Sequence, residues 1–112
     1  MPLQPAARQS FNLMAVVQSG RLQYEALLLA ASWRATNPDF AGKLYLAEPQ
    51  QNAAWPKDPS VTDAGVRALL QDLGAEILPF QAQEFGHHYP QGNKIEALAA
   101  LPDAPFLFLD TD

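Results

Sequence analysis

The sequence predicts an α/β protein built on a parallel sheet of about four strands. Short apolar segments alternate with stretches whose apolar residues recur at helical spacing, which is typical of successive strand–helix–strand units. The apolar segments are continuous rather than alternating, as expected for strands that are covered on both faces. The chain has 112 residues, of which 48% are hydrophobic, so it is long enough to form a single domain with a buried core.

The first half of the chain predicts a strand, a helix and a second strand. Residues 11–18, FNLMAVVQ, form a mostly apolar segment that ends at a Ser-Gly pair, as a buried strand does. The segment 22–36 predicts a helix, which an Asn-Pro-Asp turn ends. Its apolar stripe consists of Leu22, Ala26, Leu29, Ala30 and Trp33. Residues 43–48 predict the second strand, and the proline-rich segment 49–60 predicts a loop.

The second half predicts two further helices, each followed by a strand. Thr62 is the expected N-cap of a helix that Gly74 ends. The apolar residues of that helix are Val66, Leu69, Leu70 and Leu73. Residues 75–80 predict the third strand. After a polar loop, residues 93–101 predict a short helix, and FLFL at 106–109 predicts the fourth strand.

These elements predict a Rossmann-like winding with the strand order 3-2-1-4. Strand–helix–strand connections of a parallel sheet are right-handed, which restricts the topologies available. The first and fourth strands are then neighbours where the winding changes direction, and ligands of such sheets lie beyond the carboxyl ends of the strands there. The residues that follow these two strands are candidate parts of one site: Gln18, Ser19, Gly20, Asp110 and Asp112.

The closing segment, FLFLDTD, points to a metal site. Asp110 and Asp112 are two positions apart, so both side chains point to the same side at the end of an extended strand. Two neighbouring carboxylates repel each other, and a divalent cation removes that repulsion. Mg²⁺ and Mn²⁺ prefer oxygen ligands, including carboxylates and substrate phosphates. A solvated strand end is the alternative, but the position after an apolar strand at the switch point favours the metal site.

The segment NKIEALAALPDAPFLFLDTD resembles the signature of GT-A-type nucleotide-diphospho-sugar glycosyltransferases. In that family, a helix containing a lysine precedes an apolar strand and a D-x-D motif at a similar spacing. Here Lys94 lies sixteen positions before Asp110. The first strand with its Gln-Ser-Gly turn also suits the family, in which this region receives the nucleoside. The resemblance implies the three-layer, Rossmann-like half of a GT-A fold.

The resemblance also implies roles for individual residues. Asp112 would be the direct ligand of Mn²⁺ or Mg²⁺, and Asp110 would contact the ribose or the metal shell. Lys94 would lie near the nucleotide or the sugar. Three residues of the first turn would line the base and ribose pocket: Gln18, Ser19 and Gly20. In such enzymes the metal offsets the charge that builds on the departing nucleoside diphosphate.

The sequence contains only the first half of that fold. The second half of the family brings the acceptor site and any catalytic base, and the sequence stops at the last aspartate of the motif. We therefore expect residues 1–112 to be the nucleotide-sugar-binding domain of a longer enzyme, with no catalytic residue of its own and an unknown acceptor. Because the fourth strand would leave a sheet edge exposed, we expect the isolated chain to form a homodimer or a higher aggregate.

Composition excludes several other classes. Twelve acidic residues against seven basic ones give a net charge of -5, which argues against nucleic acid or an anionic membrane as partner. The chain has no cysteine, so thiolate metal sites are excluded and a cytoplasmic location is favoured. No apolar run approaches the ~18 residues that a membrane span needs.

Other polar and aromatic residues are weaker candidates. His87 and His88 are adjacent and would diverge in an extended segment, so we expect them in a polar loop and not in a zinc site. For Glu48 we expect a solvated strand end, with a hydrogen bond to a ribose hydroxyl as the alternative. For the loop aromatics Trp55 and Tyr89 we expect packing on the core, with stacking on a base or sugar as the alternative.

Two other function classes are possible on sequence grounds. FLFLDTD is also similar to the motif of haloacid-dehalogenase-like phosphatases, but in that class it opens the chain and here it closes it. A catalytically silent nucleotide-binding or interaction module would be the leading choice if these 112 residues were the entire natural protein. The chain has no glycine-rich dinucleotide or P-loop motif.

Overall fold

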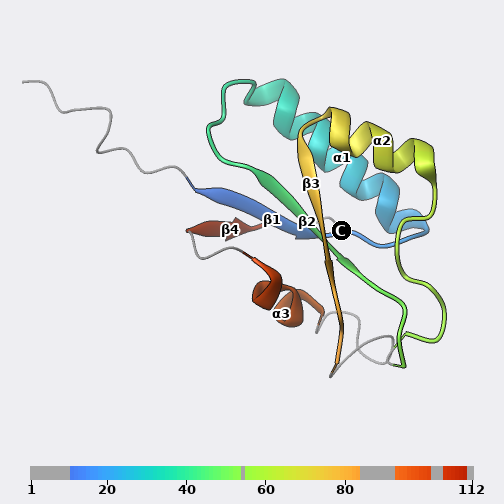
Figure 1. Cartoon of the computed structure of the whole chain (residues 1–112). Helices are drawn as coiled ribbons and strands as arrows, with labels where there is room; N and C mark the ends of the chain where they lie inside the picture. The colour runs from blue at the N-terminus through green and yellow to red at the C-terminus, as the bar shows by residue number, and fades with distance from the viewer. Residues whose placement is uncertain (1–10, 54, 84–92, 102–104, 111–112) are drawn as a thin grey trace, which may run out of the picture.

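The computed structural model describes residues 11–53, 55–83, 93–101 and 105–110 and shows the α/β architecture that the sequence predicts (Figure 1). The elements are β1 (Asn12–Val16), α1 (Arg21–Thr36), β2 (Leu44–Pro49), α2 (Ala64–Asp72), β3 (Ala75–Phe80), α3 (Asn93–Ala97), the 3₁₀ helix η4 (Leu98–Ala100) and β4 (Phe106–Phe108). The strands of these described segments form one parallel sheet in the order β3-β2-β1-β4, which confirms the predicted order 3-2-1-4.

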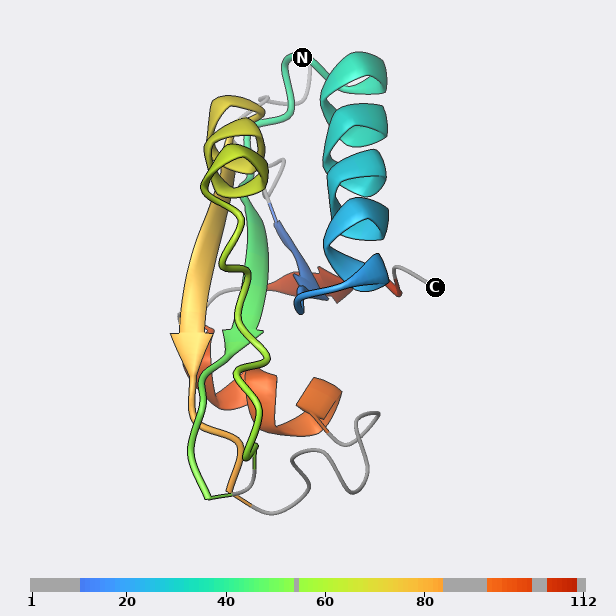
Figure 2. The ribbon, with the colours of Figure 1, turned by 90° about the vertical axis from the view of Figure 1, so that its right-hand side faces the viewer.

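The sheet lies between two layers of helices. Helices α1 and α2 cover one face, and α3 lies against the other (Figures 1 and 2). Because successive strand residues point to opposite faces, neighbouring residues of one strand belong to different cores. Leu13 of β1 is buried in the core beneath α1 and α2, whereas Met14 is buried in the core on the α3 side. The predicted three-layer arrangement is therefore present.

The strands differ in burial according to their place in the sheet. All six residues of β2 are buried, as expected for a central strand of a parallel sheet. The two edge strands, β3 and β4, are partly exposed. Pro79 lies in β3, where a missing N–H is tolerated because the strand is at an edge. On β4, Phe106 is 43% exposed and Leu107 is 51% exposed.

The boundaries of α2 follow from a capping aspartate and a glycine. The predicted cap at Thr62 is wrong by one residue, because Asp63 is the N-cap and its Oδ1 accepts from the N–H groups of Gly65 at 2.9 Å and Val66 at 3.2 Å. After the helix, Gly74 adopts φ 92°, a left-handed conformation that favours glycine. Gly74 therefore ends the helix as predicted.

Two further expectations differ in detail from the structure. The helix predicted over 93–101 is shorter, with α3 ending at Ala97 and the 3₁₀ helix η4 following it. Leu69, expected on the buried stripe of α2, is 52% exposed, and Val66 and Leu70 carry the buried face instead. Across the described residues, none of the helices has both the length and the hydropathy that crossing a bilayer requires.

Candidate functional site

The carboxyl ends of β1, β2 and β4 come together around the turn after β1. The N–H of Leu109 donates to the carbonyl of Met14 at 2.7 Å, which extends the β1–β4 pairing toward Asp110. On the other side of β1, the N–H of Ser19 donates to the carbonyl of Pro59 at 2.8 Å. The turn therefore lies between the end of β4 and the segment that joins β2 to α2.

A pocket of about 490 Å³ lies between this turn and the segment after β2. Its lining residues are Gln18, Ser19, Trp55, Pro56, Lys57, Asp58 and Pro59. The volume falls within the ~300–1,000 Å³ that is typical of small-molecule sites. An indole and two pyrrolidine rings provide apolar surface, while one amide, one hydroxyl and two charged groups provide polar contacts. A pocket of this kind at the carboxyl ends of parallel strands is the expected place for a ligand.

Trp55 is both a core residue and a wall of this pocket. It is 8% exposed and packs in the core on the α3 side with Met14, Tyr45 and Phe80. The prediction that Trp55 packs on the core is therefore confirmed. The alternative role, stacking on a base or sugar, remains compatible with this position because the same side chain lines the pocket. An indole that the core holds in place is a rigid apolar surface for a planar ligand.

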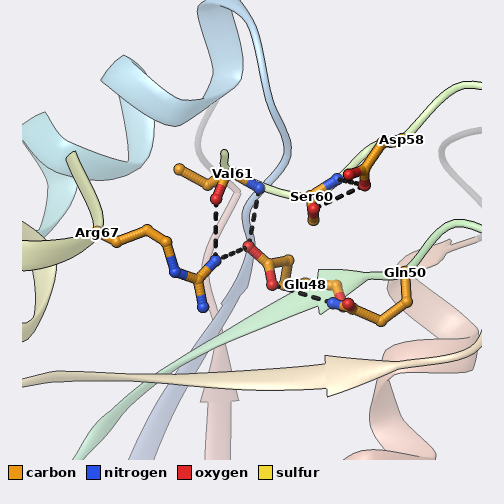
Figure 3. A network of polar contacts seen from close by, with 6 residues as sticks. All are labelled: Glu48, Gln50, Asp58, Ser60, Val61 and Arg67. Carbon is orange, nitrogen blue, oxygen red and sulfur yellow. Dashed lines mark hydrogen bonds and ion pairs between the residues drawn. The ribbon is translucent and has the colours of Figure 1, made fainter. Parts of the chain in front are cut away.

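Glu48, the fifth residue of β2, is buried and fully engaged with its neighbours (Figure 3). Its exposed fraction is 2%, so the expectation of a solvated strand end is wrong. Oε2 accepts from the backbone N–H of Val61 at 2.9 Å and from Nη1 of Arg67 at 2.5 Å. Oε1 accepts from Nε2 of Gln50 at 2.9 Å. These bonds occupy both carboxylate oxygens with protein donors, which leaves the ribose alternative without support.

The segment between β2 and α2 is also fixed at its first residues, next to the end of β3. The N–H of Gln50 donates to the carbonyl of Phe80 at 3.0 Å, and Nδ2 of Asn52 donates to Oε1 of Gln81 at 2.7 Å. Within the segment, Nε2 of Gln51 donates to the carbonyl of Pro56 at 2.7 Å. Despite its prolines and polar composition, the pocket wall is therefore held by contacts to β3 and by bonds of its own.

Asp58 places a negative charge at the pocket. Its Oδ1 accepts from the hydroxyl of Ser60 at 2.6 Å and from the backbone N–H of Ser60 at 3.0 Å (Figure 3). The hydroxyl bond, and after it the backbone bond, hold the pKa of Asp58 below its ordinary value of 3.8. Hydrogen bonds to a carboxylate favour its charged form, so Asp58 is ionised at neutral pH. Lys57 next to it provides a positive charge in the same pocket.

The structure brings several of the predicted site residues to one rim. Gln18 and Ser19 line the pocket. Gly20 adopts φ 80° and is the N-cap of α1, so it turns the chain from the rim into the helix. Asp110 is exposed directly beyond β4, the strand beside β1. Lys94 lies apart from these residues in sequence, within the first turn of α3.

Some predicted residues lie outside the described part of the chain. These are His87, His88, Tyr89 and Asp112. Within the described segments, no group of three His, Cys, Asp or Glu side chains is arranged to hold a metal ion. Because Asp112 is not among the described residues, the metal site predicted at Asp110 and Asp112 stays a prediction.

A second depression lies on the α1 side of the sheet, next to β4. It has a volume of about 370 Å³. Its lining residues are Phe11, Leu13, Leu29, Ser32, Trp33, Thr36, Asn37, Phe40, Leu107 and Leu109. Among the described residues that line it, none carries a charge. The depression is therefore mostly apolar, with polar side chains only from Ser32, Thr36 and Asn37 among its lining residues, and it extends the apolar surface of the β4 edge.

Comparison with known proteins decides the family. Residues 13–112 match the family model of the Rhodobacterales glycosyltransferase domain, so the match begins in β1 and includes every later element and the acidic segment. The chain belongs to this glycosyltransferase family. Neither the curated proteins nor the solved structures gave a match. For the glycosyltransferase domain, the predicted class of enzyme is thus confirmed, whereas the GT-A type and the D-x-D motif stay predictions.

Sequence reasoning missed two features of the glycosyltransferase domain that bear on the site. The first is the buried pair of Glu48 and Arg67, which joins β2 to α2. The available signal was an acidic residue near the end of an otherwise apolar strand. Its partner, however, is 19 positions away in the chain. The second is the contribution of Lys57 and Asp58 to the pocket, which depends on the path of an irregular segment.

Proposed function

We propose that this glycosyltransferase domain binds the nucleoside diphosphate part of a sugar donor at the rim formed by β1, β2 and β4. The observation that carries the proposal is the pocket lined by Gln18 and Ser19, at the turn where β1 ends next to β4. Two segments far apart in the sequence meet there, as in other sheets that bind nucleotides at a topological switch point. The family match supports a sugar donor as the ligand.

The base and ribose of the donor fit the pocket by its size and chemistry. Trp55 and the prolines provide flat apolar surface for a base, and the amide of Gln18 and the hydroxyl of Ser19 provide donors and acceptors for its edge or for the ribose. Lys57 is exposed and carries a positive charge that suits a phosphate. The donor nucleotide therefore meets apolar and polar groups in one pocket.

The diphosphate would extend from the pocket toward the end of β4. A divalent cation fits this part of the rim, because the exposed carboxylate of Asp110 supplies the oxygen chemistry that Mg²⁺ and Mn²⁺ prefer. Asp110 and Asp112 would hold the ion, and Lys94 would contact the nucleotide or the sugar. When bound, the cation would stabilise negative charge on the leaving diphosphate.

The domain's own residues bind and orient the donor, and the acceptor site lies elsewhere. Asp58 is ionised at the pocket and repels a phosphate placed against it, which favours the base end of the donor on that side. No described residue is assigned a catalytic role in sugar transfer. We propose that residues 1–112 bind the donor and do not by themselves transfer its sugar.

We also propose that the isolated domain self-associates through the β4 edge. An open edge strand presents unpaired N–H and C=O groups, and here it also carries the exposed side chains of Phe106 and Leu107. The apolar depression beside Trp33 continues this surface. A second copy of the chain that pairs along β4 would cover both.

Thermal denaturation with a panel of nucleoside diphosphates tests the proposal. Mn²⁺ together with at least one nucleoside diphosphate should raise the melting temperature, and Lys57→Ala should reduce that rise. Lys43→Ala is the matched control, because Lys43 is an exposed lysine paired with Glu76 at the other end of the sheet. If no nucleoside diphosphate changes the melting temperature of the wild-type chain, the proposed donor site is wrong. Binding by a full-length protein that transfers no sugar would instead favour the silent module.

A further inference from the structure

We propose that Glu48 is a positioning residue that sets the shape of the donor pocket without touching the donor; the inference rests on the proposed function for the identity of the ligand. Glu48 is not among the residues that line the pocket. It is instead bonded to the residues on either side of the wall formed by residues 55–59. One buried carboxylate thus controls where the wall lies.

The contacts of Glu48 hold both ends of the wall. Oε1 accepts from Nε2 of Gln50, which precedes the wall, at 2.9 Å. Oε2 accepts from the N–H of Val61, which follows the wall, at 2.9 Å. Figure 3 shows both bonds converging on the same side chain from opposite ends of the segment. The start and the end of the segment are therefore fixed to one point at the carboxyl end of β2.

Arg67 completes this arrangement from α2. Its Nη1 donates to Oε2 of Glu48 at 2.5 Å and to the carbonyl of Val61 at 3.1 Å (Figure 3). The pair therefore holds the backbone of Val61 through its N–H and through its carbonyl. Because Glu48 is 2% exposed, water has little access to replace a lost bond. Leaving a buried donor without an acceptor costs more free energy than the bond itself contributes.

A glutamine at position 48 cannot reproduce these contacts. The groups that face the carboxylate from Gln50, Val61 and Arg67 are all donors. A carboxylate accepts on both oxygens, whereas an amide has one oxygen and one NH₂ group, which only donates. With the Gln50 amide oriented as in the structure, Glu48→Gln therefore leaves either the Gln50 end or the Val61 end without an acceptor. One end of the wall is then released while the size of the side chain is unchanged.

Loss of the hydrogen bond between Glu48 and Val61 would affect the pocket through Pro59. Pro59 lies two residues before Val61, lines the pocket, and accepts the hydrogen bond from Ser19. Moving Pro59 changes the separation between the turn after β1 and the wall. A base held between Ser19 and Trp55 then loses contact on one side. Affinity for a nucleotide should decrease even though no residue that touches it has changed.

The test compares Glu48→Gln with Glu76→Gln in a Trp33→Phe background, where Trp55 is the single remaining tryptophan. Acrylamide quenching of Trp55 and hydrogen exchange of residues 51–61 are measured without nucleotide. Glu48→Gln should increase the quenching constant and accelerate exchange by about tenfold or more at the end of the segment that it releases, either just after Gln50 or at Val61. Glu76→Gln removes the same charge from an exposed ion pair of the same sheet, and it should change neither quantity.

A substitute variant and a nucleotide titration complete the test. If Glu48→Gln does not fold, Gln50→Ala replaces it, because it releases only the first end and should accelerate exchange of the residues just after it. Unchanged quenching and exchange in a folded variant would overturn the positioning role. Titration with the same panel of nucleoside diphosphates plus Mn²⁺ then separates the claims. A wild-type chain that binds none of them contradicts the donor site, while a Glu48→Gln chain that binds as tightly as wild type contradicts positioning.

Discussion

The backbone N–H of Leu109 lies 2.7 Å from the carbonyl oxygen of Met14, and this hydrogen bond carries the β1–β4 pairing beyond the last residue of β4. Asp110 therefore emerges beside the carboxyl end of β1, next to the strand that leads into Gln18 and Ser19. The acidic segment after β4 and the turn after β1, which are far apart in the sequence, lie on one rim because of this register. The predictions below test what the rim binds and what holds it in place.

Asp110→Asn should weaken Mn²⁺-dependent binding of a nucleoside diphosphate by about tenfold or more, because it removes one charged oxygen donor from the proposed metal shell. Isothermal titration with Mn²⁺ present measures the change. Binding measured without a divalent ion should be less affected. Asp39→Asn serves as the control, since Asp39 is an exposed aspartate beyond the end of α1. Equal affinity of the Asp110→Asn and wild-type chains would argue against a metal at this position.

Trp55→Leu should weaken nucleotide binding by ~1–3 kcal/mol, which is the range for loss of one base–aromatic stacking contact. Leucine keeps an apolar side chain in the core, so the protein should remain folded while the flat wall of the pocket is lost. Fluorescence of an added labelled nucleotide measures affinity, and urea denaturation measures stability. Trp33→Phe changes the other tryptophan, which lies in the apolar depression, and should leave affinity unchanged.

Ser60→Ala should raise the pKa of Asp58 toward its ordinary value of 3.8, because it removes the hydroxyl bond that lowers the pKa most. A lowered pKa in the folded state means that the Asp58–Ser60 bonds stabilise the protein above the unfolded pKa. That contribution is lost as the pH falls through the folded pKa, below about pH 4. Carboxyl carbon NMR of Asp58 across this pH range gives the titration directly. Coinciding titrations of wild type and Ser60→Ala would contradict the assigned cause.

Gly74→Ala should destabilise the protein more than Gly20→Ala. Both glycines have positive φ, 92° and 80°, so an alanine at either position carries a backbone cost of roughly 1–2 kcal/mol. At Gly74 the added methyl would also meet the guanidinium of Arg34, whose Nε donates to the carbonyl of Leu73 at 2.9 Å. At Gly20 nothing lies within 4 Å of the added carbon. Urea denaturation of the two variants gives the comparison.

Leu107→Lys should shift the isolated chain from dimer toward monomer, because it places a charge on the exposed β4 edge. Multi-angle light scattering at high protein concentration measures the mass. Leu28→Lys, on an exposed position of α1 that is 71% accessible, is the control and should leave the mass unchanged. A wild-type chain that is monomeric throughout would remove the basis for the proposed edge pairing.

The sequence predicts the fold well because its signals are local. Continuous apolar segments mark the buried strands, and the glycine at position 74 marks the end of α2. The strand order then follows from a Rossmann-like winding, one of the topologies that right-handed connections allow. The cap of α2 fell one residue from the predicted position because Thr62 and Asp63 are both good capping residues, and local geometry decides between them.

The site is predicted less completely because its walls depend on contacts between distant residues. Gln18 and Ser19 follow a strand, so their place at the rim follows from the topology. Lys57 and Asp58 lie in an irregular segment whose path depends on Glu48, Arg67 and residues beyond β3. The sequence predicts a solvated Glu48, whereas its burial results from the packing of that segment. Periodicity carries no information on such contacts.

Paramagnetic broadening by Mn²⁺ in the presence of a nucleoside diphosphate tests the central claim most directly. In the amide NMR spectrum of the chain, Mn²⁺ broadens signals of residues near the ion. We predict that the signals of Asp110, Ser19 and Gly20 broaden first, while those of Lys43 and Glu76 at the opposite end of the sheet stay sharp. Broadening centred on that opposite end, or none that depends on the nucleotide, would contradict a sugar-donor site at the rim of β1 and β4.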